Sequence, residues 1–181
     1  MRKRGFTLVE LLVVIAIIAL LMGILMPALA RVRQLAFRMT CGTNLAGIGK
    51  AMLIYANDYE DELPRAGGRL SQWNGPVVWN AADRYNAYGV SQSDGSGGKA
   101  TITSCFYLLV KYAEVTPKSF VCKGDTGTTE WQLSDETNVT TGFEMIDAWD
   151  FGQNPVDNCS YSYHIPFGQY ALTTSSEPGL A

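Results

Sequence analysis

The sequence predicts an α+β protein, in which one long N-terminal helix is followed by a small head containing an antiparallel sheet. The first thirty residues contain an almost uninterrupted apolar run, long enough for a helix of membrane-spanning length. The next segment, 31–57, repeats apolar residues at steps of three or four, as an amphipathic helix does. The rest of the chain contains short stretches rich in β-branched and aromatic residues, which are typical of strands.

Length and charge limit the classes of function. The chain has 181 residues, 47% of them hydrophobic and 17% charged, which is the composition of a folded protein with room for one small domain. Residues 1–50 contain seven Lys or Arg and one acid, whereas residues 51–181 contain seven Lys or Arg and sixteen acids. A nucleic-acid partner is therefore not expected, because such binding depends on basic surface that neutralises phosphates.

The N-terminus consists of a basic head, MRKRG, and the apolar run FTLVELLVVIAIIALLMGILMPALA, in which Glu10 is the only ionisable residue. About twenty helical residues cross the hydrocarbon core of a bilayer. A cleavable signal peptide is disfavoured, since its apolar region is usually about 7–15 residues long. A simple uncleaved anchor explains the length of the run, but it gives no reason for Glu10, because a carboxylate in lipid is costly.

Residues Gly5-Phe6-Thr7-Leu8-Val9-Glu10 resemble the prepilin processing site of type IV pilins and type II secretion pseudopilins, and the apolar run resembles the helix that follows it. The resemblance implies a ladle-shaped pilin-like fold, cleavage after Gly5 by a prepilin peptidase, and N-methylation of Phe6. It also implies that Glu10 meets the terminal amine of a neighbouring subunit during assembly. The alternative is that Glu10 pairs with the amine of its own chain, about one helical turn away.

The same resemblance implies a structural, non-enzymatic subunit without a cofactor. Its expected partners are the prepilin peptidase and methyltransferase, copies of itself in a helical filament, other minor pseudopilins and an inner-membrane assembly platform. The chain would cross the inner membrane once, with a periplasmic head, and would later join a periplasmic or extracellular filament. The expected segments are a leader (1–5), a transmembrane half-helix (6–30), an amphipathic half-helix (31–57) and an α+β head (58–181).

Several alternatives stay open at this level. The rival function is a membrane-anchored periplasmic binding or enzymatic domain behind an uncleaved anchor. Within the pilin family, Glu10 favours a body subunit over a minor initiating subunit, since tip-type pseudopilins can lack this acid. Secretion, adhesion, motility and DNA uptake are not distinguished, because they differ in partner ATPases and surface loops.

The long helix has two weak points in its apolar half, Gly23 and Pro27, since proline lacks a backbone donor and glycine is a poor helix former. Two interpretations stay open: the helix melts locally at residues 20–27 when it packs in a filament, or it is simply kinked there. The helix is expected to end by about Asn57, because the acids that follow oppose the helix dipole, and Pro64 prevents its continuation.

In the head, the sequence predicts a hairpin near Trp73-Asn74-Gly75, a Gly- and Ser-rich loop over Asn86–Gly98, and a short helix over Ser104–Glu114 with Thr103 or Ser104 as its N-cap. Four later segments are strand-like and together predict the antiparallel sheet: Ser119–Cys122, Thr129–Leu133, Ser160–His164 and Gln169–Thr173.

Three further segments resemble a pseudopilin-like group abundant in planctomycete-type bacteria: Cys41-Gly42-Thr43-Asn44-Leu45 inside the long helix, and Tyr107–Tyr112 and 117–122 in the head. In that group the segment resembling Ser162–Ala181 runs on into more chain. The resemblance therefore implies a chain that is truncated at Ala181.

Residues for enzyme chemistry are sparse. The lone histidine, His164, falls in an alternating segment and is expected at the surface or lining a pocket rather than in catalysis. The Gly95–Lys99 stretch lacks the spacing of a phosphate loop, and there is no zinc signature or dinucleotide-binding turn. An enzyme is therefore not predicted.

The four cysteines contain no C-x-x-C pair, which favours disulfides in an oxidising compartment over a zinc site. Three connectivities are possible among Cys41, Cys105, Cys122 and Cys159. The favoured pair is Cys122–Cys159, which would join two strand-like segments, and Cys41 is the alternative partner.

Acidic turns raise the possibility of bound calcium. Asp58 and Asp61 follow the long helix, Asp125 closes a Cys-Lys-Gly-Asp turn, and Asp147 and Asp150 lie in a third acidic stretch. These segments lack the D-x-D-x-D-G pattern of a calcium loop, so solvated turns are expected. Calcium nevertheless stays open, because the resemblance includes pseudopilins that bind calcium in this domain.

Overall fold

The computed structural model describes residues 8–68, 70–163 and 174. By its internal contacts the chain divides into two compact units, Met1–Met39 and Thr40–Ala181. The first helix, α1 (Leu8–Asp58), begins in the first unit and ends in the second.

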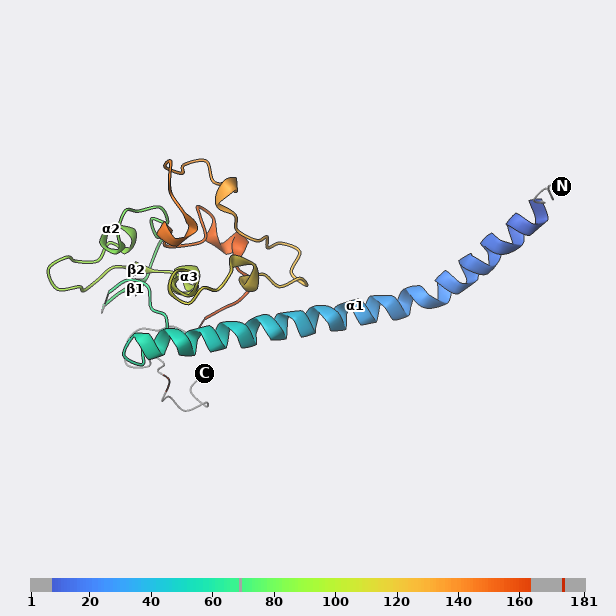
Figure 1. Ribbon diagram of the computed structural model, residues 1–181, viewed down its shortest axis with the longest axis horizontal. Helices are drawn as coiled ribbons and strands as arrows, with labels where there is room; N and C mark the ends of the chain where they lie inside the picture. Colours follow the sequence, from blue (N-terminus) through green and yellow to red (C-terminus); the bar gives the residue numbers. More distant parts are fainter. Residues whose placement is uncertain (1–7, 69, 164–173, 175–181) are drawn as a thin grey trace, which may run out of the picture. The chain divides into compact units, whose positions relative to one another are not determined.

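The first unit consists, in its described part, of the apolar half of α1 and the turns that follow it. An 18-residue window of α1 has a mean hydropathy of 3.1, and none of that window is buried, so the helix is long and apolar enough to cross a membrane. Pro27 lies inside α1, which stays helical on both sides of it. Its missing N–H leaves the carbonyl of Gly23, four residues earlier, without the usual helical donor, and Figure 1 shows the blue part of α1 curving.

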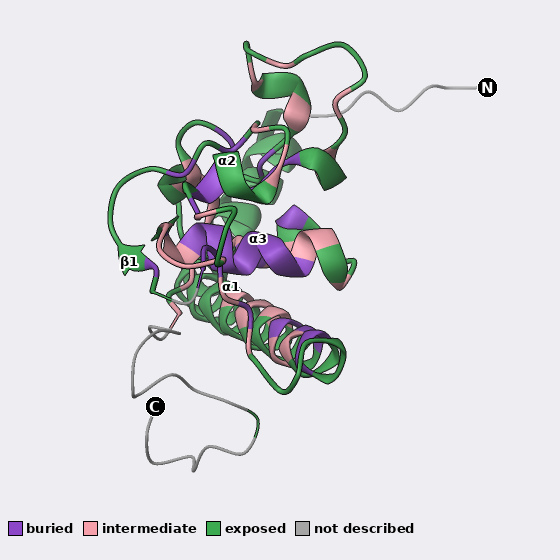
Figure 2. Cartoon of the chain, turned by 90° about the vertical axis from the view of Figure 1, so that its left-hand side faces the viewer, coloured by how far each residue is buried: buried purple, intermediate pink, exposed green. Residues whose placement is uncertain are grey.

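The second unit is built around the end of α1 and the helix α3 (Ile102–Tyr112). Ile48, Ala51 and Tyr55 of α1 share one core cluster with Phe106 and Leu109 of α3. Figure 2 shows α3 almost entirely buried, whereas α1 is buried on one side of its last turns only. The amphipathic pattern expected for residues 31–57 is confirmed only from Ile48 onward, because Val32, Leu35, Met39 and Leu45 of the expected apolar face are exposed.

Both predicted helix positions are confirmed within two residues. The helix α1 ends at Asp58, where the acids begin, and α3 occupies Ile102–Tyr112 where Ser104–Glu114 was expected. The predicted N-cap was wrong, because the cap is Thr101. Its hydroxyl accepts from Ser104 N at 3.0 Å, and Ser104 Oγ accepts from Thr101 N at 2.9 Å, so the two residues form a capping box.

The predicted antiparallel sheet is wrong. The sheet in the described residues has two strands, β1 (Gln72–Trp73) and β2 (Lys99–Ala100), which pair in parallel with Gln72 opposite Lys99 and Trp73 opposite Ala100. The expected hairpin at Trp73-Asn74-Gly75 is also wrong, since β1 takes a partner 27 residues further along the chain. The α+β class stands, with a long apolar helix, further helices and this small sheet.

In the described residues, the predicted strands 119–122, 129–133 and 160–163 do not form, and the regular elements after α3 are short 3-10 helices. These are η1 (Pro117–Phe120), η2 (Leu133–Asp135), η3 (Met145–Asp147) and η4 (Pro155–Asn158). The residues 119–122 and 160–163 do lie together, because Ser160 N donates to Phe120 O at 2.9 Å, but they form no strand. His164 and the predicted strand Gln169–Thr173 lie outside the described residues.

The expected Gly- and Ser-rich loop begins later than predicted. The helix α2 (Arg84–Tyr88) occupies its start, because Asp83 Oδ1 accepts from Asn86 N at 2.8 Å and caps the first turn. Gly89 ends the helix with φ +67°, a conformation that favours glycine.

Candidate assembly helix and its attachment to the head

Glu10 lies exposed in the first turn of α1. A carboxylate is favoured there, because the N-terminus of a helix has partial positive charge. Gly5 and Phe6, the residues of predicted cleavage and methylation, lie outside the described residues.

The surface of α1 after Glu10 is apolar on every side. The large apolar side chains between Leu8 and Leu29 are 46–77% exposed, and the helix buries no side chain before Ile48. A soluble monomer rarely exposes a contiguous apolar surface of this extent. This half of α1 therefore presents a surface that suits lipid or other apolar helices.

Three arginines follow the apolar segment, Arg31, Arg33 and Arg38, and all are exposed. The guanidinium carbon of Arg33 lies 5.5 Å from the centre of the Phe37 ring, a cation–π contact. Basic residues at the end of a membrane-length helix suit the lipid headgroup region.

A disulfide joins α1 to the head within the second unit. Cys41 is bonded to Cys122, 81 residues along the chain, so the favoured pairing of Cys122 with Cys159 was wrong and the alternative partner Cys41 is the one observed. Next to it, Asn44 Nδ2 donates to Val121 O at 3.2 Å. The sequence favoured Cys159 because residues 119–122 and 160–163 resembled paired strands, but the side chain that reaches Cys122 comes from α1.

The two remaining cysteines are free thiols. Cys105 is completely buried in α3, accepts from Ala66 N at 3.4 Å, and has its pKa raised to about 12 by burial. Burial likewise raises the pKa of Cys159. Both are thiols rather than thiolates at neutral pH, and this makes them poor nucleophiles.

The calcium candidates lie at the end of α1 and in a distant turn, and each has a partner of its own. Asp58 Oδ1 accepts from Asn57 Nδ2 at 3.3 Å, and Asp61 Oδ1 accepts from Thr174 Oγ1 at 3.1 Å. Asp125 accepts from Thr128 Oγ1 at 2.6 Å and Gly127 N at 3.1 Å, and these bonds lower its pKa. Within residues 8–68, 70–163 and 174, no three His, Cys, Asp or Glu side chains are grouped to hold a metal. Calcium binding stays an untested prediction.

Asp150 was expected in a solvated turn, and this expectation was wrong. Its side chain is 1% exposed, accepts from Thr101 Oγ1 at 2.8 Å and Thr103 Oγ1 at 3.1 Å, and also from Phe151 N. Burial raises its pKa to about 6, although the hydrogen bonds act in the opposite direction. The flanking Trp149 and Phe151 were the signal of burial in the sequence.

Comparison with known proteins identifies the N-terminal feature. The family model described as the prokaryotic N-terminal methylation motif matches residues 1–26. Comparisons with curated proteins and with solved structures return no match. The motif is that of type IV pilin-like and pseudopilin subunits, whose role is structural, and it implies processing by a prepilin peptidase and assembly into pilus-like filaments. Together with α1, it is consistent with a single-pass, membrane-anchored protein. No comparison supports the closer resemblance to the planctomycete-type group.

Proposed function

We propose that this protein is a structural subunit of a type II secretion pseudopilus or a type IV pilus-like filament. The observation that supports it is the methylation motif at the start of a helix whose apolar surface is exposed on every side. Cleavage after Gly5 would remove three basic residues and place a charged amine on Phe6, so that Glu10 becomes the fifth residue of the mature chain.

Glu10 supplies the specificity of assembly. An isolated carboxylate and an isolated ammonium are each costly in lipid, so pairing them across two subunits is favoured over leaving both unpaired. Apolar side chains that move from lipid to neighbouring helices gain little hydrophobic free energy, because lipid tails are equally apolar. Close packing and the Glu10–amine pair must therefore select the position of an incoming subunit.

The assembled state is an open helical array. A head-to-tail contact uses two different surfaces of each subunit, so it propagates instead of closing. Membrane insertion would store monomers in the inner membrane with their heads in the periplasm. The Cys41–Cys122 disulfide supports this location for the head, because disulfides persist in oxidising compartments.

The first experiment is intact-mass and N-terminal peptide analysis of the protein from cell envelopes. The expected mature chain begins with N-methylated Phe6. A chain that still begins at Met1 in cells with an active prepilin peptidase would contradict the proposal and favour a simple anchor. A chain beginning at Arg31 would indicate an exported soluble protein instead.

The second experiment separates assembly from anchoring. In Glu10→Ala, we expect normal membrane levels and normal processing, but loss of sheared filaments detected by immunoblot and electron microscopy. Val9→Ala, at the neighbouring exposed position, is the matched control and should still assemble. If Glu10→Ala assembles as the wild type does, its intersubunit role is wrong. If neither protein forms filaments when all assembly components are present, an anchored periplasmic binding or enzymatic domain becomes the better explanation.

A further inference from the structure

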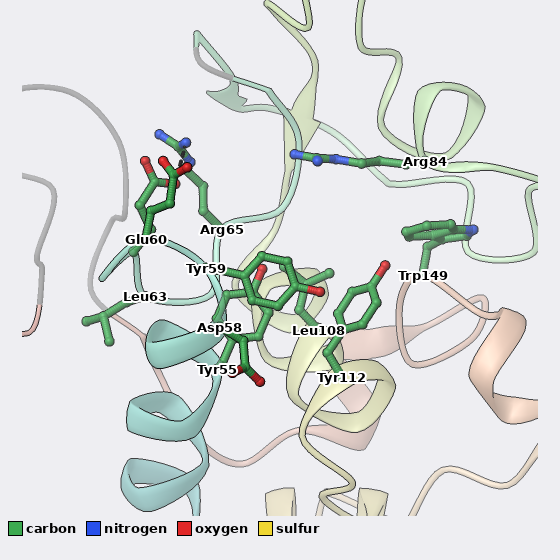
Figure 3. A pocket seen from close by; sticks show the side chains of 11 residues that line it. Tyr55, Asp58, Tyr59, Glu60, Leu63, Arg65, Arg84, Leu108, Tyr112 and Trp149 are labelled. Atoms are coloured by element: carbon green, nitrogen blue, oxygen red, sulfur yellow. Dashed lines mark hydrogen bonds and ion pairs between the residues drawn. The ribbon is translucent and has the colours of Figure 1, made fainter.

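A pocket of about 590 Å³ opens in the second unit, between the end of α1 and the end of α3. Its volume lies within the range of small-molecule sites. Figure 3 shows that aromatic rings from both helices form its floor, with Arg84 on one side and Glu60 and Arg65 on another. This pocket has no part in the proposed assembly.

The aromatic floor presents two usable ring faces. Tyr59 stacks on Tyr55, with ring centres 4.2 Å apart and an interplanar angle of 11°. Tyr112 is inclined to Tyr59 by 54° at 5.6 Å. Tyr59 and Tyr112 are 40% and 42% exposed, whereas Trp149 is nearly buried and has Lys111 Nζ at 3.9 Å from its ring centre. A ligand can therefore stack on one of these two rings and contact the other.

The rim of the pocket contains both signs of charge. Asp58, Glu60 and Glu62 contribute carboxylates, and Arg65 and Arg84 contribute guanidinium groups. Glu62 and Arg65 form an ion pair at 2.7 Å, and Arg84 donates to the carbonyl of Gly67. These two contacts hold both guanidinium groups at the rim.

This combination restricts the chemistry of the ligand. The arginines would repel a cationic ligand, and the carboxylates would repel an anionic one. A purely apolar ligand would remove water from the charged rim without replacing its hydrogen bonds. A neutral ligand with an apolar face and many hydroxyls satisfies all of these groups, because carboxylates accept and guanidinium groups donate. We propose that the pocket binds a saccharide, with a pyranose ring stacked on Tyr112, one edge against the inclined ring of Tyr59, and its hydroxyls paired with the charged rim.

The test uses the full mature chain in a polyoxyethylene detergent, because a maltoside or glucoside headgroup is itself a saccharide. Saturation-transfer NMR would be run with glucose, galactose, mannose and N-acetylglucosamine up to about 100 mM, a range that includes millimolar affinities. Adenosine and arginine ethyl ester are the competing neutral and cationic probes. We expect saturable binding of at least one sugar and weaker binding of both other probes.

Variants then locate the binding. Tyr112→Ala should weaken sugar binding about tenfold, because it removes one stacking face, whereas Tyr112→Phe should retain most of it. Tyr85→Ala is the matched control, since Tyr85 is also 42% exposed but lies on α2 outside the pocket lining. Asp58→Asn keeps an acceptor and removes a charge, so it should abolish binding of a cation but only weaken that of a sugar.

Three outcomes would overturn the proposal. They are the absence of saturable binding for every sugar, sugar binding that Tyr112→Ala leaves unchanged, and preferential binding of adenosine or arginine ethyl ester. None of these outcomes bears on filament assembly, which depends on Glu10 and the apolar half of α1.

Discussion

Removing the Cys41–Cys122 disulfide tests how much this bond between α1 and the head stabilises the second unit. Replacing both cysteines in Cys41→Ala/Cys122→Ala releases a loop defined by a sequence separation of 81. The loop-entropy relation assigns about 4.5 kcal/mol to such a cross-link. With about 2.1 cal/mol/K of unfolding entropy per residue, the second unit of the chain should melt about 15 °C lower.

The assay is thermal unfolding of the mature protein in detergent, followed by near-ultraviolet circular dichroism. This signal reports the packed aromatic side chains of the head rather than the long helix. Reductant should lower the melting temperature of the wild type to that of the double variant and should leave the variant unchanged. Cys159→Ala is the control, and it should cost about 1 kcal/mol, since its thiol has no disulfide partner.

Two results would refute this reasoning. One is a double variant that melts within about 3 °C of the wild type, because a shift that small corresponds to about 1 kcal/mol in a unit of this size. The other is peptide mapping under non-reducing conditions that links Cys122 to Cys159.

Three further predictions concern the head. Between pH 4 and 6 stability should fall as pH rises, because the pKa of Asp150 moves from 3.8 in the unfolded chain to about 6 in the fold, and the folded state retains the proton longer. In Asp150→Asn the urea midpoint should lack this component of the pH dependence. If the midpoint falls with pH equally in the wild type and the variant, the prediction is wrong. Gly152→Ala should cost more than about 2 kcal/mol, because Gly152 has φ +73° and an added Cβ would overlap Glu136 Oε1 and Trp131 Nε1, which share a 3.0 Å hydrogen bond. Gly142→Ala, at φ +88° in open space, should cost only about 1 kcal/mol in the same urea experiment, and equal costs would exclude the overlap as the cause. Thr101→Val should destabilise the head by about 1–2 kcal/mol, because it removes both the α3 cap and the hydrogen bond to Asp150, whereas Thr116→Val, at an N-cap without a side-chain cap bond, should have little effect on the urea midpoint.

The sequence by itself determined the features that depend on neighbouring residues. Apolar content predicted a membrane-length helix, and the acids after Asn57 placed its end within one residue of Asp58. The three-to-four periodicity around Tyr107 placed α3 within two residues. The Gly5–Glu10 motif indicated the pilin-like class by its resemblance to the prepilin processing site. Each of these patterns acts over one or a few turns of chain, where local propensity and hydrophobic period dominate.

The tertiary structure alone decided which distant segments meet. Residues 119–122 and 160–163 lie together without forming strands, and the ladder formed instead between two-residue strands at 72–73 and 99–100. Cys122 reached Cys41 because the packing of α1 placed it there, and Asp150 became buried beneath Thr101 for the same kind of reason. Burial and cross-chain pairing depend on how the whole core closes, whereas a sequence window records only local preference. The Tyr59 and Tyr112 faces of the pocket were likewise invisible in the sequence, because they come together only when α1 and α3 pack.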